Sequence, residues 1–396
     1  MFRIVKGSVL LIKSLVITGV VAAFIAGCSK FTTKDNVEPP TKLASLKSEI
    51  SIRSVWDQDT GVGTARLSFR IRPAIVDGVV YTVDVRGRVN AFTLKTGKKL
   101  WTTELKKPVS SGPTVAEGLL VVGTTDGEVI ALDKKVGKKR WITRVSSEVL
   151  AAPLIEEGVV VVRTINGILQ GLKVSDGKSA WIYRRRAPLL TMRGNSSPVA
   201  WKGLIYVGFD DGKMACIKTT SGRLIWEQAI TLVRGRTELE RLVDIDSDPV
   251  VSNGILYVVT FQGKLAAINI RARQLLWSRK LSSFKNITVD GSRVFVTDEQ
   301  SRVWAFDRQT GVAIWKQEGL LHRKLTGPAV SENYVIVGDF DGYLHWLDKA
   351  DGSLIARIRG DKKGFIEAPV AVSGYVVSLG RGGELSVHKE APLKKK

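Results

Sequence analysis

Apolar and polar positions alternate along most of the chain in short runs that tight turns separate. A typical unit begins at a proline and passes through a few apolar residues to a polar-glycine pair. It then continues into a β-branched strand; Pro73, Asp77-Gly78 and the strand from Val79 to Val83 form one such unit. A second polar-glycine pair then leads to a third strand. Such pairs suit the positive φ angles of two-residue hairpins, so each unit predicts antiparallel strands joined by tight turns.

A turn followed by a tryptophan closes most units and predicts the fourth strand. The tryptophans, with Ala356 in the last copy, lie 40, 40, 45, 51, 38 and 41 positions apart, at Trp101, Trp141, Trp181, Trp226, Trp277, Trp315 and Ala356. The copy before Trp277 lacks the turn glycine. A period of about 40 to 45 residues is typical of one four-stranded propeller blade. We expect the tryptophans to pack between blades.

Counting the units predicts an all-β fold, an eight-bladed β-propeller with four antiparallel strands in each blade. The eighth unit, from Pro369 to Val387, ends after its third strand. The run from Ile50 to Trp56 is strand-like and carries a tryptophan, so we expect it to complete the last blade. That pairing closes the ring and removes exposed sheet edges. We assign the propeller to residues 50–390 and a basic tail to residues 391–396.

The N-terminal residues read as an export signal. Basic residues precede an apolar stretch, Ser14 to Gly27, that is too short to span a bilayer. It ends in Ile25-Ala26-Gly27-Cys28, which matches a bacterial lipobox. We therefore expect a signal peptide over residues 1–27, an acylated Cys28 and a flexible tether over residues 28–49. Ser29, in place of aspartate, favours the periplasmic face of the outer membrane over the inner membrane.

The cysteine count and the net charge narrow the range of expected partners and covalent links. After removal of the signal peptide, Cys216 is the one cysteine left, and we expect a buried, inert thiol rather than a disulfide. The whole chain carries a formal net charge of +22, which suits anionic headgroups or an acidic partner. Nucleic acid is not an expected partner, because no binding motif is present in this exported chain.

The repeat is broken at two consecutive places, and these are where we look for function. The span from tryptophan to the next blade's proline is 12 positions at Trp101–Pro113, but 17 at Trp181–Pro198 and 23 at Trp226–Pro249. The two lengthened loops are neighbours and leave from one face. The first carries Leu190 and Met192 as apolar anchors beside Arg193. The second ends in acidic residues after an expected helical turn over Thr237 to Leu242. Apolar anchors rimmed by both charge signs favour a protein-docking surface.

Catalytic and metal-binding motifs are not evident. Asp244, Asp246 and Asp248 alternate, but an EF-hand loop starting at Asp244 would need glycine and glutamate where Pro249 and Ile255 stand. The three histidines lack metal-ligand spacing. We therefore expect no metal, no cofactor and no catalytic residue.

The units resemble the propeller repeats of the quinoprotein superfamily. A lipobox followed by eight such blades resembles the BamB family, lipoprotein subunits of the outer-membrane β-barrel assembly complex. The resemblance covers essentially the whole chain. It is most specific in four segments: Leu190 to Gly194, Glu238 to Pro249, Leu320 to Arg323 and Gly342 to Trp346.

The BamB resemblance implies a non-enzymatic scaffold that binds the periplasmic POTRA domains of BamA and other subunits of the complex. It would assist the folding and insertion of outer-membrane β-barrel proteins, with unfolded outer-membrane proteins as a further partner. It assigns Leu190, Met192, Arg193, Asp244 and Asp246 to the partner site. Met192 stands where the family commonly has leucine, a change of similar volume. The alternative is a periplasmic quinoprotein-type dehydrogenase or a ligand-binding propeller. Such dehydrogenases typically add a vicinal cysteine pair and calcium ligands, which this chain lacks.

Overall fold

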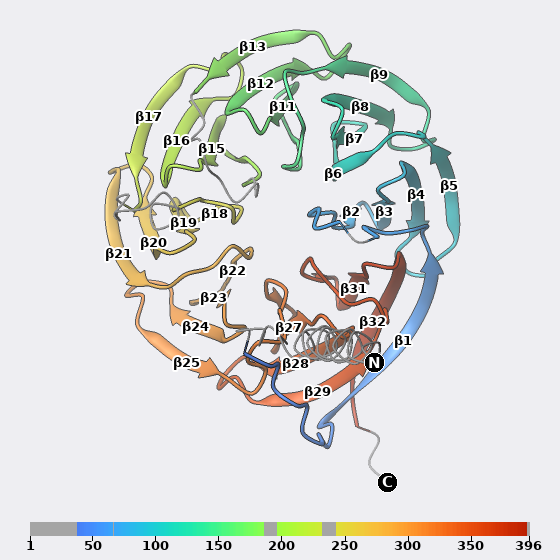
Figure 1. The fold of residues 1–396 in the computed structure, drawn as a ribbon, viewed down its shortest axis with the longest axis vertical. Coiled ribbons are helices and arrows are strands. Elements are labelled where there is room, and N and C mark those ends of the chain that lie inside the picture. Colours follow the sequence, from blue (N-terminus) through green and yellow to red (C-terminus); the bar gives the residue numbers. More distant parts are fainter. Residues whose placement is uncertain (1–37, 66, 186–195, 232–242, 394–396) are drawn as a thin grey trace, which may run out of the picture. The chain divides into compact units, whose positions relative to one another are not determined.

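Eight four-stranded antiparallel sheets form a ring in the computed structural model (Figure 1). The structure describes residues 38–65, 67–185, 196–231 and 243–393. Residues Pro40–Lys396 form one compact unit. In the parts of the chain that the structure covers, no helix is long and apolar enough to cross a membrane. The expected eight-bladed propeller is confirmed.

Blades one to seven run in chain order from the innermost to the outermost strand, whereas blade eight takes its outermost strand, β1, from the N-terminal side. Blades one to three comprise β2 (Ala74–Val76), β3 (Val79–Val83), β4 (Arg88–Thr93) and β5 (Lys99–Glu104); β6 (Val109–Ala116), β7 (Leu119–Thr124), β8 (Glu128–Asp133) and β9 (Lys139–Arg144); β10 (Leu154–Glu156), β11 (Val159–Arg163), β12 (Ile168–Lys173) and β13 (Ser179–Arg184). Blades four to six comprise β14 (Val199–Trp201), β15 (Leu204–Gly208), β16 (Lys213–Lys218) and β17 (Leu224–Ala229); β18 (Val250–Ser252), β19 (Ile255–Val259), β20 (Lys264–Asn269) and β21 (Gln274–Lys280); β22 (Thr288–Asp290), β23 (Arg293–Thr297), β24 (Val303–Asp307) and β25 (Ala313–Gln317). Blade seven comprises β26 (Ala329–Val330), β27 (Tyr334–Gly338), β28 (Tyr343–Asp348) and β29 (Leu354–Arg359), and blade eight β30 (Val370–Val372), β31 (Tyr375–Leu379), β32 (Glu384–Pro392) and β1 (Ile50–Asp59).

The polar-glycine turns adopt the conformation that their sequence demands. Asp77 and Gly78, between β2 and β3, have φ angles of 53° and 73°. Positive φ at both central residues is the requirement of a type I′ turn, whose twist matches that of the flanking strands. The local turn chemistry therefore directs the chain back on itself within each blade.

The N-terminal strand closes the ring, as the sequence predicts. β1 pairs antiparallel with β32 from Ile50 opposite Pro392 to Asp59 opposite Glu384. The propeller therefore extends to Pro392, two residues past the expected boundary at 390. The indole Nε1 of Trp56 donates to the carbonyl of Leu94 in blade one at 2.8 Å. The chain runs on from β1 in blade eight to β2 in blade one, so the pairing of β1 with β32 is the non-covalent link that closes the ring.

The outer-strand tryptophans seal the seams between blades, which confirms their expected role. The ring of Trp56 lies so close to Gly97 in the next blade that a Cβ atom at position 97 would be only 2.6 Å from it. The same contact recurs for Trp101 with Gly137 and for Trp141 with Gly177. The glycine of each turn-tryptophan signal thus makes room for the tryptophan of the preceding blade.

The buried core lies between adjacent sheets, and Cys216 belongs to it. Its side chain has no exposed surface and packs in the cluster around Trp226 and Leu256. Burial raises the pKa of the Cys216 thiol, which keeps it protonated and unreactive. The expectation of a buried thiol is confirmed.

Residues 41–49 differ from the expected flexible tether. The amide N–H of Thr41 donates to the carbonyl of Leu321 at 3.0 Å, and Glu49 donates to Ile355 at 2.8 Å. Arg323 Nη1 donates to the Thr41 carbonyl at 3.1 Å. Contact with the propeller is therefore already present at Thr41, ahead of residue 50, because loops and an outer strand of blade seven offer hydrogen-bonding partners to this segment.

Candidate functional site

The two lengthened loops connect β13 to β14 and β17 to β18. Leu190, Met192, Arg193 and the expected helical turn over Thr237 to Leu242 lie outside the described residues. The described bases of the loops contact one another, since the Ser197 N–H donates to Asp248 Oδ1 at 2.7 Å. The expectation that the loops are neighbours is therefore correct at their bases.

Asp244 and Asp246, which the resemblance assigns to the partner site, are buried in the structure. Their exposed fractions are 0% and 3%. The apolar side chains of Val243 and Ile245, which alternate with them, are also buried. The Ile245 N–H donates to the Phe209 carbonyl at 3.2 Å. The apolar residues draw this segment into the ring, and the two aspartates follow because they occupy the intervening positions.

A cluster of three carboxylates results where this segment meets blade four. Asp210, in the turn between β15 and β16, joins Asp244 and Asp246, and one carboxylate oxygen of each lies within 4.8 Å of the others. Arg163, only 1% exposed, donates from Nη2 to Asp210 Oδ1 at 2.6 Å and from Nη1 to the Ser196 carbonyl at 3.3 Å. We call these four residues the loop-base cluster. It fixes the bases of both lengthened loops with buried charge.

The charges of the loop-base cluster act on Asp246 in opposite directions. Burial, and then the negative charge of Asp210, raise the pKa of Asp246 from 3.8 to about 6. The positive charges of Arg163 and Arg70 lower it and only partly compensate. An aspartate in this state is sensitive to protonation in a mildly acidic range.

Replacing Asp246 with asparagine is expected to flatten the pH dependence of stability between about pH 4 and pH 6. The folded carboxyl binds its proton more tightly than the unfolded one, so its contribution to the free energy of unfolding falls as pH rises through this range. Asparagine does not titrate. Melting temperatures of both proteins should therefore show a wild-type minus variant difference that decreases with pH. A difference that stays constant or increases would contradict the assignment.

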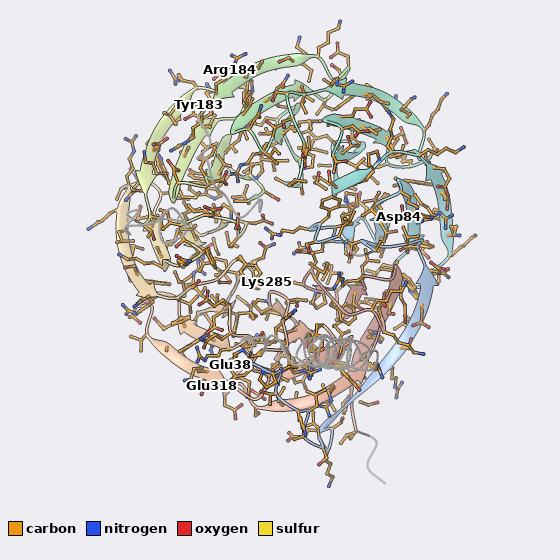
Figure 2. All side chains as sticks on the ribbon, viewed as in Figure 1. Glu38, Asp84, Tyr183, Arg184, Lys285 and Glu318 are labelled. Atoms are coloured by element: carbon orange, nitrogen blue, oxygen red, sulfur yellow. The ribbon has the colours of Figure 1, made fainter. Side chains whose placement is uncertain are left out.

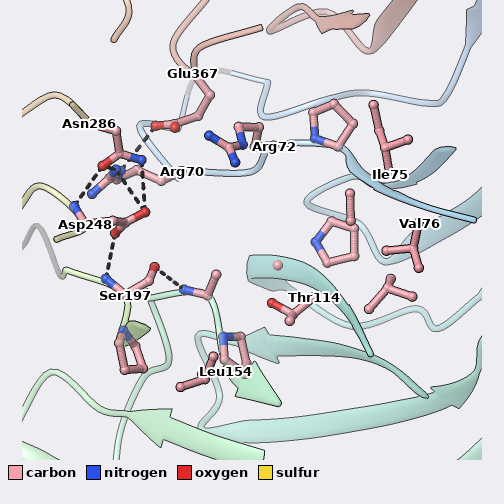
Figure 3. Close-up of a pocket in the computed structure, with 18 of the residues that line it drawn as sticks. Arg70, Arg72, Ile75, Val76, Thr114, Leu154, Ser197, Asp248, Asn286 and Glu367 are labelled. Atoms are coloured by element: carbon pink, nitrogen blue, oxygen red, sulfur yellow. Dashed lines mark hydrogen bonds and ion pairs between the residues drawn. The ribbon is translucent and has the colours of Figure 1, made fainter. Parts of the chain in front are cut away.

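Arg70 links several blades inside the ring and was not identified from the sequence. Its guanidinium donates to Glu367 Oε1 at 3.2 Å and to Asn286 Oδ1 (Figure 3). It also donates to the Asp246 carbonyl. Burial alone would lower the pKa of Arg70, but the carboxylates of Asp248 and Glu367 raise it above its ordinary value. Arg70 therefore remains charged and joins loops that belong to blades one, five, six and eight.

The hydrogen-bonded network continues around the inside of the ring. Asn286 Nδ2 donates to Asp248 Oδ2 at 2.9 Å, and the Ala152 N–H donates to Ser197 Oγ at 3.1 Å (Figure 3). The network borders a cavity of about 330 Å³. Asp248, Ser197 and Ala152 each directly precede the proline that opens a blade. That position is the sequence signal that points to the inner lining, whereas no pattern marks Arg70.

A second buried network explains two of the segments that resemble the BamB family. Arg323 donates from Nε to Asp339 Oδ2 at 2.8 Å and from Nη2 to Asp341 Oδ2 at 2.7 Å. His345 Nε2 lies 3.0 Å from the same Asp339 oxygen. Burial lowers the pKa of His345, which favours the neutral ring. Because Arg323 also binds the Thr41 carbonyl, this network fixes the N-terminal segment to blade seven.

Comparison with known proteins agrees with this architecture. Residues 85–317 match the family model described as outer membrane protein assembly factor BamB. The chain is 46% identical to the outer membrane protein assembly factor BamB of Kangiella koreensis over 94% of its own length and 95% of the relative. It is 34% identical to that of Escherichia coli over 94% and 98%.

Solved structures show the same fold. The crystal structure of BamB from Moraxella catarrhalis matches with a TM-score of 0.78 and 26% identity, over 86% of this chain and all of that one. Quinohemoprotein alcohol dehydrogenase from Comamonas testosteroni matches with a TM-score of 0.67 and 14% identity, over 87% and 77%. The second likeness concerns the fold alone. The match of the family model, together with relatives of 34–46% identity over nearly the whole chain, shows that this chain belongs to the BamB family of outer membrane protein assembly factors.

Proposed function

We propose that this protein is a non-enzymatic scaffold of the machinery that assembles β-barrel proteins in the outer membrane. It is anchored by lipid to the periplasmic face of that membrane and binds the POTRA domains of BamA. The names of its relatives support the assembly role. The observation that carries the docking proposal is the joining of two adjacent lengthened loops at their bases by Ser197 and Asp248.

The docking surface is assigned to the face on which these loops leave the propeller. Leu190 and Met192 supply apolar anchors to the partner, and Arg193 supplies a charged hydrogen bond that sets orientation. Asp244 and Asp246 support the same surface indirectly, because both are buried at the base of the second loop. In this proposal the two aspartates position the loop, and the residues of the loops touch the partner.

Replacing Arg193 with alanine is expected to weaken binding to BamA about thirtyfold or more, because losing a central charged anchor commonly costs about 2 kcal/mol. The melting temperature should change little. Affinity is measured by titrating BamA against the full-length variant in lipid nanodiscs. The matched control is Lys106→Ala with Lys107→Ala, in the ordinary-length loop between β5 and β6. Full binding by the Arg193 variant together with loss in the control would move the docking surface to the basic loop.

Replacing Asp244 with asparagine separates a positioning role from a contact role. If Asp244 holds the loop base, the variant loses BamA affinity and melting temperature together, since a buried charged group loses its interactions. A variant that loses affinity but keeps its melting temperature would show that Asp244 contacts the partner directly and would overturn the positioning role.

Replacing Cys28 with alanine is expected to abolish lipid attachment, because the lipobox thiol is the acylated atom. Cells grown with a radioactive fatty acid should label the wild-type protein and leave the variant unlabelled. Cys216→Ala, which removes the buried thiol, is the control and should label normally. Absence of label from the wild-type protein would contradict lipid anchoring.

The enzymatic alternative is tested by cofactor binding. Wild-type protein incubated with pyrroloquinoline quinone and calcium should show no shift in the absorption spectrum of the quinone and no gain in melting temperature. Saturable binding with either response would contradict the scaffold proposal and favour a quinoprotein-type enzyme.

A further inference from the structure

A larger cavity lies on the same face as the lengthened loops. It has a volume of about 730 Å³ and is lined by loops between blades and by turns between second and third strands. Its large apolar side chains come from five connecting segments of the ring and include Phe69, Phe284, Leu325, Phe340, Phe365 and Ile366. Pockets of this size with a mostly apolar lining are typical of ligand-binding sites. We call it the mouth pocket.

Most of the carboxylates that line the mouth pocket already accept hydrogen bonds from other groups of the protein. Glu367 accepts from Arg70 Nε at 3.2 Å, and Glu299 accepts from Ser282 Oγ at 2.7 Å. Asp298 accepts from the indole of Trp304 at 3.0 Å. The remaining lining carboxylate is Asp246 of the loop-base cluster, which is buried. Three of the four lining carboxylates are therefore engaged by other groups of the protein, and the fourth is buried.

Three basic side chains of the mouth pocket, by contrast, have no hydrogen-bond acceptor among the described residues. Within the described ranges, the side chains of Lys285, Lys324 and Arg381 form no hydrogen bond and no ion pair. Arg381 Nε is buried and donates to no acceptor among those residues. The Lys285 ammonium lies 4.9 Å from the centre of the Phe284 ring, and the residue lies toward the inside of the ring of blades in Figure 2. Burial lowers the pKa of Lys285, and Glu367 only partly opposes that effect.

A pocket that combines a mostly apolar lining with unpaired basic side chains favours a ligand with an apolar body and negative charge. The three cations come from three separate places, the loops β21–β22 and β25–β26 and the turn β31–β32. A single carboxylate does not satisfy groups on three different loops, whereas an extended chain with carboxylates on either side of a ring offers acceptors to more than one of them. A buried unpaired guanidinium nitrogen also gains most from an acceptor that arrives with the ligand.

We propose that the mouth pocket binds an extended peptide segment in which an aromatic residue lies between acidic residues. The aromatic ring packs against the apolar lining, and the carboxylates pair with Lys285, Lys324 and Arg381. This inference rests on the proposed function, because an assembly factor for β-barrel proteins meets unfolded client chains. The binding of client peptide and the docking of BamA then take place on one face but at different residues.

The test uses the full-length protein in lipid nanodiscs and a fluorescent decapeptide with one phenylalanine between two aspartates. Changes in fluorescence anisotropy report binding. We expect saturable binding, and an affinity about tenfold lower for the Lys285→Gln, Lys324→Gln double variant, since two ion pairs are lost, one to the partly buried Lys285 and one to the exposed Lys324. Lys362→Gln with Lys363→Gln is the matched control, because both lysines are exposed on the adjacent loop β29–β30 and do not line the pocket. The control should bind as the wild type does.

Two altered probes define the ligand. A peptide with serine in place of phenylalanine and one with asparagines in place of aspartates should each bind at least about tenfold more weakly. Phenylpropionate, which carries a ring and a single carboxylate, should fail to compete. Competition by phenylpropionate at equal affinity, or equal binding by the control and double variants, would overturn the proposal.

Parallel titration with BamA separates this inference from the proposed function. The Lys285→Gln, Lys324→Gln variant should keep full BamA affinity while losing peptide. If wild-type protein binds BamA but not the decapeptide, the peptide site is wrong and the docking proposal stands. If it binds the decapeptide but not BamA, the docking proposal fails and the peptide site is retained without its assembly context.

Discussion

Deleting Ile50 to Trp56 is expected to lower the melting temperature by about 10 °C or more. The deletion removes most of β1 and exposes the edge of β32, with which it pairs. It also removes Trp56, which is 9% exposed and packs with its ring centre 6.2 Å from that of Phe92 in blade one. Loss of a buried large aromatic alone costs about 3–5 kcal/mol, a large share of the stability of an ordinary domain.

Thermal unfolding followed by circular dichroism checks this closure. Trp56→Ala should reproduce a large part of the loss, since the seam to blade one depends on this side chain. Leu100→Ala, on the outer strand β5 and 46% exposed, is the control and should change the melting temperature little. An unchanged melting temperature of the deletion variant would show that the ring does not need β1.

Replacing Arg163 with leucine is expected to be the most destabilising single change in the loop-base cluster. It removes the buried partner of Asp210 and leaves three neighbouring carboxylates with less compensating charge. Breaking a buried ion pair commonly costs about 3–5 kcal/mol, because the remaining charge stays buried without its partner. The loss should be smaller at pH 5 than at pH 7.5, since protonation of Asp246, whose pKa is raised to about 6, relieves its repulsion with the neighbouring carboxylates.

Melting temperatures at the two pH values test this expectation. Arg140→Leu is the control, because Arg140 is 59% exposed and pairs with Asp133 at the surface. Exposed pairs contribute at most about 1 kcal/mol, so this control should melt close to the wild type at both values. An equal loss for Arg163→Leu at pH 5 and pH 7.5 would show that carboxylate repulsion is not its cause.

The fold was predictable from the sequence because short local signals in each blade specify its turns and its contacts with the next blade. Asp77-Gly78 specifies a hairpin without reference to the rest of the chain, and Gly97 marks the position that receives the tryptophan of the preceding blade. Closure was also predictable, since the last unit lacks one strand and the run at Ile50 supplies it. These signals depend on spacing and backbone conformation, which a repeat displays many times.

The chemistry of the site was less predictable because it depends on distant partners. Aspartates in a loop are ordinarily exposed, and only the alternating Val243 and Ile245 hinted that this segment turns inward. Burial of Asp244 and Asp246 further depends on two residues from other parts of the chain. These are Arg163, which lies on the inner half of blade three, and Asp210. Arg70 joins four blades from a loop that carries no motif. Such contacts follow from the closed ring and have no local pattern in the sequence.

Photo-cross-linking to BamA in the intact membrane tests the docking face most directly. An amino acid with a photoreactive side chain is placed at Met192, in the first lengthened loop, or at Val136. Val136 is 64% exposed in the turn between β8 and β9, and antiparallel topology places that turn on the opposite face of the ring from the loops that join blades. We predict a cross-link to BamA from position 192 and none from position 136. A cross-link from position 136 with none from position 192 would contradict the account.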